Sequence, residues 1–124
     1  MDYTIHVSNS PLVTVVETPE FLTRVDKLMT DGERERLIAY LAANPTGGDL
    51  IPGTGGVRKL RWGLEGRGKR GGARVIYFYQ NADVPLFALT IFAKNERADI
   101  SQRDRNVLRG LTRLLVDTYR RSRR

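Results

Sequence analysis

The chain has 124 residues, of which 40% are hydrophobic and 28% are charged. These proportions are those of a soluble globular protein and exclude a disordered chain. The length fits one domain over residues 1–124. Lys and Arg exceed Asp and Glu by 21 to 14, and the net charge of +7 is typical of proteins that bind nucleic-acid phosphates. Cysteine is absent, which excludes disulfides and thiolate chemistry. No signal-peptide pattern or membrane-length apolar run is found, so we expect a cytoplasmic protein without membrane contact.

The first part of the chain predicts one strand and two helices. Residues 13–17, VTVVE, are rich in β-branched side chains and precede a Thr-Pro pair that is typical of a helix start. Apolar residues at helical spacing then predict a helix over 19–29. A second helix is expected over 30–45, because Thr30 and Glu33 have the spacing of a capping box. The short break between the two helices predicts a helical hairpin.

The second part predicts three strands and a final helix. Residues 46–56 hold five glycines and a proline, which predicts a loop. Strands are expected over 57–62, 73–80 and 85–94, with a hairpin turn between the last two. A helix is expected over 102–119. Its predicted apolar stripe consists of Val107, Leu108, Leu111, Leu114, Leu115 and Thr118.

The expected order of elements is therefore β-α-α-β-β-β-α, which indicates an α+β fold. Residues 1–12 fit no element well and are interpreted as an N-terminal extension or an extra edge strand. Residues 120–124 form an Arg-rich tail. In the strand over 57–62, the alternation of apolar and basic residues slips at Lys59-Leu60, which is compatible with a β-bulge.

Positive charge is densest in residues 58–74, which contain a single acid, Glu65. The cations of this stretch are Arg58, Lys59, Arg61, Arg67, Lys69, Arg70 and Arg74. Because glycine removes side-chain bulk while Lys and Arg supply charge, the segment GRGKRG at 66–71 predicts a clamp for a phosphate backbone. A flexible, soluble connection between strands is the alternative. Residues 63–70, GLEGRGKR, also resemble a P-loop, but Arg70 replaces the Ser or Thr that binds magnesium and a strand follows instead of a helix.

The available side chains restrict the chemistry. His6 is the single histidine, and the acids do not recur at a metal-ligand spacing, so neither a metal nor a cofactor is expected. Cleavage of RNA by its own 2′-hydroxyl suits this inventory, because the protein then aligns the nucleophile, moves protons and stabilises charge on the phosphorane. Lys59, Lys69 and Lys94 are the candidate proton acceptors.

Three motifs, GTGGVRKLRW, GRGKRGGARVIYFY and IFAKNERADIS, follow one another along the chain. In this order and spacing they resemble the RelE/ParE toxin superfamily of bacterial toxin–antitoxin systems, and within it a HigB-like branch, from Val13 to Val116. The resemblance implies a twisted, mostly antiparallel sheet with an N-terminal helical hairpin and a C-terminal helix. It also implies a ribosome-dependent mRNA endonuclease that contacts 16S ribosomal RNA. Such a toxin would be neutralised by a cognate antitoxin and would be monomeric outside that complex.

The resemblance also implies a site. The expected catalytic residues are Arg74, Lys94, Arg61 and Lys69, with Arg74 stabilising the phosphate. The expected RNA-binding residues are Lys59, Arg58, Arg67, Arg70 and Glu96. Two positions depart from the family pattern, since Asn95 replaces an arginine and Ser101 replaces a catalytic tyrosine, and the acid and the base are therefore unassigned.

Two other functions are compatible with the sequence. One is a ParE-like inhibitor of DNA gyrase, which the dense cations of the strand region disfavour. The other is an RNA-binding module without catalysis. Tyr77 and Tyr79, which alternate along one strand, are expected to pack in the core, whereas Trp62 could either pack or stack on a base.

Overall fold

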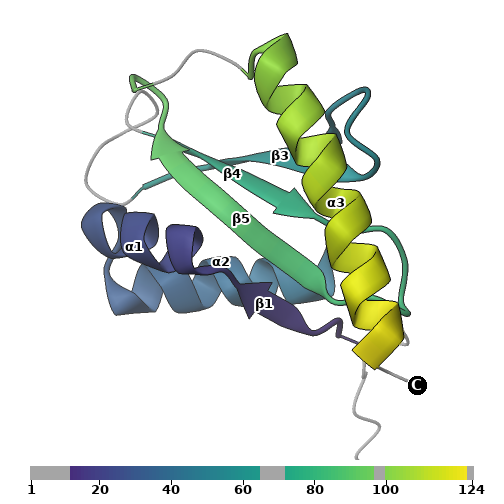
Figure 1. Ribbon diagram of the computed structural model, residues 1–124. Coiled ribbons are helices and arrows are strands. Elements are labelled where there is room, and N and C mark those ends of the chain that lie inside the picture. Colours follow the sequence, from purple (N-terminus) through teal and green to yellow (C-terminus); the bar gives the residue numbers. More distant parts are fainter. Residues whose placement is uncertain (1–11, 65–71, 97–99, 123–124) are drawn as a thin grey trace, which may run out of the picture.

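The computed structural model describes residues 12–64, 72–96 and 100–122. In this part of the chain, a sheet lies between a helical hairpin on one face and a single long helix on the other (Figure 1). The elements, in chain order, are β1 (Val15–Glu17), α1 (Pro19–Leu28), α2 (Asp31–Ala43), β2 (Asp49–Leu50), β3 (Val57–Trp62), β4 (Ala73–Phe78), β5 (Leu86–Ala93) and α3 (Gln102–Ser122).

The sheet has the strand order β1-β5-β4-β3-β2. Only the β1–β5 pair is parallel among these strands, so the expected α+β fold with a mostly antiparallel sheet is confirmed. Strand β2 corrects the expectation that residues 46–56 form a loop. Asp49 and Leu50 pair with Lys59 and Arg58, which makes β2 a two-residue edge strand inside a glycine-rich stretch.

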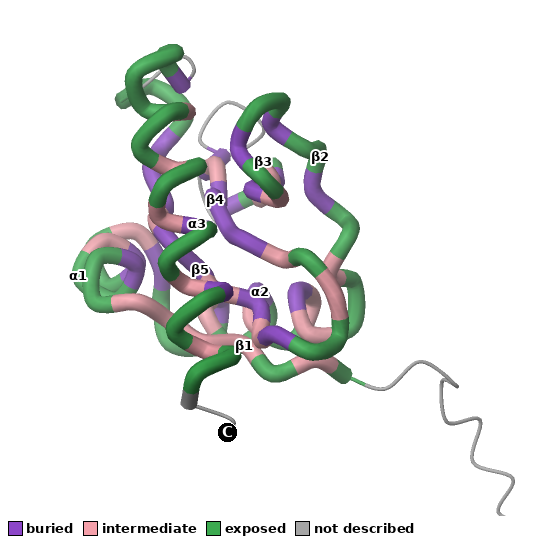
Figure 2. Tube along the Cα trace, turned by 45° about the vertical axis from the view of Figure 1, so that its right-hand side comes forward, coloured by how far each residue is buried: buried purple, intermediate pink, exposed green. Residues whose placement is uncertain are grey.

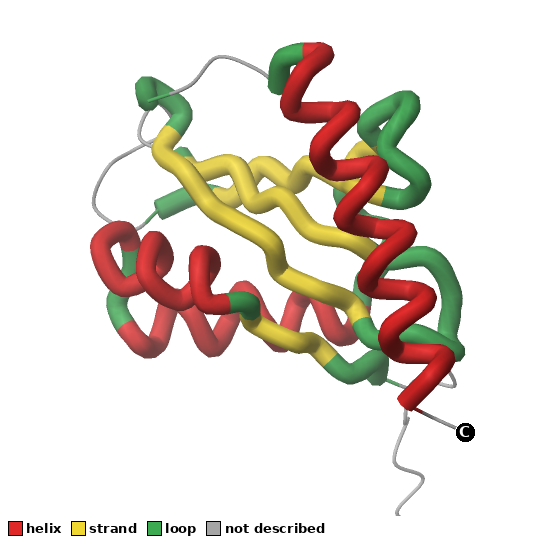
Figure 3. The backbone as a smooth tube through the Cα atoms, in the orientation of Figure 1, coloured by secondary structure: helices red, strands yellow, loops and turns green. Residues whose placement is uncertain are grey.

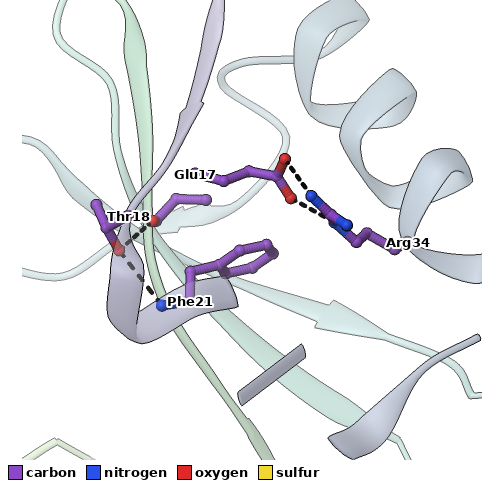
Figure 4. A network of polar contacts seen from close by, with 5 residues as sticks. Glu17, Thr18, Phe21 and Arg34 are labelled. Atoms are coloured by element: carbon purple, nitrogen blue, oxygen red, sulfur yellow. Dashed lines mark hydrogen bonds and ion pairs between the residues drawn. The ribbon is translucent and has the colours of Figure 1, made fainter. Parts of the chain in front are cut away.

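Both helices of the hairpin begin where the sequence predicted. The hydroxyl of Thr18 accepts a hydrogen bond from the Phe21 N–H at 3.4 Å and donates one to the Ala88 carbonyl at 2.9 Å, so it ties the start of α1 to β5. Thr30 and Glu33 form the complete capping box of α2. Figure 4 shows Thr18 and Phe21 beside a second link, which joins the Arg34 side chain on α2 to Glu17 at the end of β1.

Each face of the sheet has its own apolar core. Leu60, Val75 and Tyr77 pack with the helical hairpin, whereas Ile76 and Phe78 pack with α3. Figure 2 shows that β4 is buried along most of its length between the two layers. Because neighbouring residues of a strand point to opposite faces, β4 contributes to both cores.

The β-bulge expected at Lys59-Leu60 is wrong. β3 pairs with β4 without interruption, and the register shifts instead between β4 and β5, where Ile76 faces Thr90 and Tyr77 faces Ala88. The apparent slip has a different cause. Arg58 lies on the covered face with Leu60, so a basic residue occupies a position where alternation predicts an apolar one.

The apolar stripe predicted for α3 is partly wrong. Val107 and Leu114 are 64% and 62% exposed, whereas Thr112 and Val116 are buried. The helix is turned toward the loop that precedes β3, since the Thr112 hydroxyl donates a hydrogen bond to a carbonyl oxygen there at 3.0 Å. Leu108, Leu111 and Leu115 are packed as predicted.

The structure also places part of the expected Arg-rich tail. α3 continues to Ser122, so Arg120 and Arg121 are helical and exposed. Within the described ranges, no helix combines the length and the apolar character needed to cross a membrane.

Candidate functional site

Arg61 on β3 and Arg74 on β4 are direct cross-strand partners. Lys59 lies on the same side of β3 as Arg61, because residues two apart in a strand share a face. Lys59 faces Ile76, which packs in the core under α3, so all three cations lie on the face of the sheet that α3 covers in part. Like charges opposite each other destabilise a sheet, and an anion between these two arginines would offset that repulsion.

α3 leaves the cationic end of this face open. The helix is anchored near the start of β3 and the end of β4, where Val57 and Phe78 are fully buried (Figure 1). Arg61, at the other end of β3, is exposed, and Arg74 is half-buried. The guanidinium of Arg74 donates to a backbone carbonyl, that of Ala73, at 3.2 Å.

Among the described residues, no carboxylate forms an ion pair with either arginine. The ion pairs formed between described residues are Arg34 with Glu17 and Arg24 with Glu96, both outside the α3 face of β3 and β4. The charges of Arg61 and Arg74 are therefore available to an anionic ligand.

Lys94 lies at the same end of the sheet. Its backbone N–H donates to the Gly72 carbonyl at 2.9 Å, two residues before Arg74, and its side chain is exposed. The expected site residues Arg67, Lys69 and Arg70 lie outside the described residues. In the sequence, they fall between β3 and β4.

The structure places Arg58 and Glu96 away from this cluster. Arg58 lies on the hairpin face, where its guanidinium donates to the carbonyls of Gly48 at 2.8 Å and Thr46 at 3.2 Å. Glu96 pairs with Arg24 of α1 at 3.6 Å. Both placements favour a structural role over RNA contact.

Tyr77, Tyr79 and Trp62 lie in or against the hairpin-side core. Tyr77 is fully buried, and its hydroxyl accepts the Gly48 N–H at 2.8 Å. Burial raises the pKa of Tyr77 above the ordinary value of 10.0, because it disfavours the phenolate. Its expected packing role is confirmed, and Tyr79 is half-buried against the same core. Trp62 packs on Tyr40 with ring centroids 5.5 Å apart, which favours a core role for Trp62 as well.

Sequence reasoning missed one cation, Arg105. It lies seven residues before the buried Thr112, that is two helical turns, and therefore on the sheet-facing side of α3. An arginine that falls on the inner side of an amphipathic helix is the signal that could have found it. Among the described residues, no group of three or more His, Cys, Asp or Glu side chains is placed to hold a metal ion.

A family model described as the RelE toxin of the RelE/RelB toxin–antitoxin system matches residues 29–122. The match contains β2 to β5 and α3, and with them the whole cationic stretch over 58–74. It does not distinguish the HigB-like branch, which stays a prediction.

Proposed function

Because this chain belongs to the RelE toxin family, we propose that it blocks translation by cutting mRNA on the ribosome. Membership makes the protein a toxin of a toxin–antitoxin system and implies a cognate antitoxin. The proposal adds the reaction, the substrate and the place of action, which is the cytoplasm, where 16S ribosomal RNA would supply further contacts.

The observation that supports the proposal most directly is the Arg61–Arg74 pair. Two arginines are cross-strand partners on adjacent strands, and Lys59 lies on the same face. Neither arginine has a carboxylate partner among the described residues. Planar guanidinium groups bind phosphate oxygens in a bidentate manner. A phosphodiester at this position would offset the repulsion between them.

The reaction proposed is an intramolecular transfer. The 2′-oxygen of the RNA forms a bond to the neighbouring phosphorus, the bond from phosphorus to the 5′-oxygen breaks, and the products are a 2′,3′-cyclic phosphate and a 5′-hydroxyl. One proton leaves the 2′-hydroxyl and one reaches the leaving oxygen. Arg61 and Arg74 would stabilise the charge of the phosphorane, and Lys94 and Lys69 are the candidates for proton transfer.

A bacterial translation extract tests the proposal. Purified protein is added, and the 5′ ends of the mRNA are mapped with and without ribosomes. We expect ribosome-dependent cuts, and a loss of about 100-fold or more in the rate for Arg74→Ala, the usual effect of removing one group that stabilises transition-state charge.

Arg36→Ala is the matched control, because Arg36 is exposed on α2, in the layer that covers the other face of the sheet. This variant should cut as the wild type does. Intact mRNA and unaffected translation with the wild-type protein would contradict the proposal. If DNA supercoiling by gyrase were inhibited equally by the wild type and Arg74→Ala, the gyrase function would replace it.

A further inference from the structure

The residue that leads into α3 packs on the same face of the sheet as the cations. Ile100, which directly precedes α3, packs in one core with Ile76 and Phe92. The register of the strands places Phe92 opposite Arg74 and Ile76 opposite Lys59. Figures 1 and 3 show the helix running past the start of β3 and on to the start of β5.

Arg105 lies on the side of α3 that faces β3. One flank of the helix, which includes Asp104 and Leu108, lines a groove of about 520 Å³ shared with α1 and β5. Thr112 lies on the side toward the start of β3, and helical geometry places Arg105 in line with Thr112, two turns earlier. The side chain is therefore carried toward the strand that holds Lys59 and Arg61.

The Nε donor of Arg105 lacks a hydrogen-bond partner in the described part of the chain. The side chain is half-buried, and the Nε atom itself is buried. A buried donor of a charged group that lacks a partner costs free energy. The neighbouring acid on α3, Asp104, lines the groove on the other flank of the helix, so it does not neutralise the β3 side.

We infer that Arg105 joins Arg61 and Arg74 in a single phosphate-binding site between α3 and the sheet, which binds the backbone of single-stranded RNA. The inference rests on the proposed function and deepens it. The helix supplies a third guanidinium from above the sheet, and one phosphate can accept hydrogen bonds from several guanidinium groups. In this arrangement the bound RNA passes between the first part of α3 and the end of β3 and start of β4.

Binding of an uncleavable RNA tests the inference apart from catalysis. The probe is a short, fluorescently labelled single strand with 2′-O-methyl groups, whose blocked 2′-oxygens cannot attack phosphorus. Fluorescence anisotropy gives its dissociation constant at several salt concentrations. We expect Arg105→Met, which keeps an apolar stem of similar length, to weaken binding about tenfold or more, as for one charge-assisted hydrogen bond. The slope of log affinity against log salt should fall by about 0.7, the value for one phosphate contact on a single strand.

Arg103→Met is the matched control. Arg103 is exposed on the same turn of the helix, but two residues away and therefore on the opposite side. It should change the affinity by less than about twofold, as an exposed charge would. Arg105→Lys should keep the salt slope and recover part of the affinity, which a purely structural role for Arg105 would not explain. Thermal unfolding by circular dichroism establishes that each variant is folded.

Three results would overturn the inference: wild-type affinity and slope in Arg105→Met, an equal loss in Arg103→Met, or no binding of the probe by the wild type at low salt. The proposed function fails separately. If the protein binds the probe through Arg105 but leaves mRNA intact in the extract, the binding site is supported and the nuclease proposal is wrong. A protein that cuts mRNA while Arg105→Met binds the probe normally keeps the nuclease and loses this site.

Discussion

Arg58 and Arg61 belong to the same strand, yet the two faces of the sheet use them differently. On the hairpin face, the Arg58 guanidinium is held by two backbone carbonyls. On the α3 face, Arg61 is exposed opposite another arginine. Two backbone carbonyls hold one guanidinium nitrogen of Arg58, although its Nε has no partner among the described residues. We infer that Arg58 mainly stabilises the fold, whereas Arg61, placed against a like charge, is suited to bind an anionic ligand.

The helical layers on the two faces of the sheet also differ, in their balance of acidic and basic residues. α1 and α2 together carry five acids and four bases, whereas α3 carries six arginines and two acids. Of the two helical layers, the one formed by α3 is therefore the more positive. This asymmetry agrees with the placement of the proposed RNA path on that side.

Replacing Arg61 should produce the largest effect and would test the comparison directly. We expect Arg61→Ala to lower the rate of mRNA cleavage about 100-fold, because one of two opposed guanidinium groups is lost. The midpoint of thermal unfolding should stay the same or rise, since the variant removes a like-charge pair. Cleavage rates in the translation extract and circular dichroism measure the two effects. A variant that loses stability and keeps its cleavage rate would break the comparison.

Arg58→Ala should show the opposite pattern. The carbonyls of Gly48 and Thr46 lose their donor, and we expect the free energy of unfolding to fall by about 1–3 kcal/mol. Urea unfolding measures this change. Cleavage by the folded fraction should remain within about twofold of the wild type, as for a residue that does not contact the transition state. A large loss of cleavage at unchanged stability would return Arg58 to the RNA-binding set.

Tyr77→Phe sharpens the comparison on the hairpin face. It leaves the buried Gly48 N–H without its acceptor, and we expect a loss of about 1–2 kcal/mol in unfolding free energy at neutral pH. The pKa of Tyr77 is raised by burial, so the folded state favours the neutral phenol. Its contribution to stability is complete below the unfolded pKa near 10.0 and is lost as the pH rises through the folded pKa.

Urea unfolding of both proteins from pH 7 to pH 11 gives the measurement. The stability gap between the wild type and Tyr77→Phe should narrow above about pH 10, the ordinary pKa of tyrosine. A constant gap across this range would show that the hydroxyl contributes only through its hydrogen bond.

The smallest effect is expected for Glu96→Gln. Its partner Arg24 is 3.6 Å away, and both side chains are well exposed, so the pair is screened by solvent. We expect the unfolding free energy to change by less than about 0.5 kcal/mol and cleavage to be unaffected. A cleavage rate that falls tenfold at unchanged stability would place Glu96 in the active site after all.

Local signals in the sequence predicted much of the fold. The Thr-Pro start of α1 and the capping box of α2 are correct because a cap depends on residues within one turn. β2 was missed, because its two residues pair with a strand that follows eight residues later along a glycine-rich loop. The stripe of α3 was partly wrong for a similar reason, since the burial of Thr112 depends on the loop before β3 and not on helical spacing.

The candidate site divides in the same way. The sequence identified Arg61 and Arg74 as important cations, but their pairing depends on the register of β3 and β4. The sequence could not show that Arg58 and Arg61 lie on opposite faces of the sheet, because the alternation of polar and apolar residues in β3 is interrupted. Arg105 was missed because its role depends on where α3 crosses the sheet.

The parallel pairing of β1 with β5 sets the order in which the newly made chain is completed. β3, β4 and β5 follow one another closely, so they can pair soon after they leave the ribosomal exit tunnel. β1 is synthesised before the other strands, but it pairs with β5, which begins at Leu86. Val15 therefore cannot pair until all the residues between the two strands have been made. The first strand to be made is therefore among the last to join the sheet. Its backbone hydrogen-bonding groups remain unpaired until β5 has been synthesised.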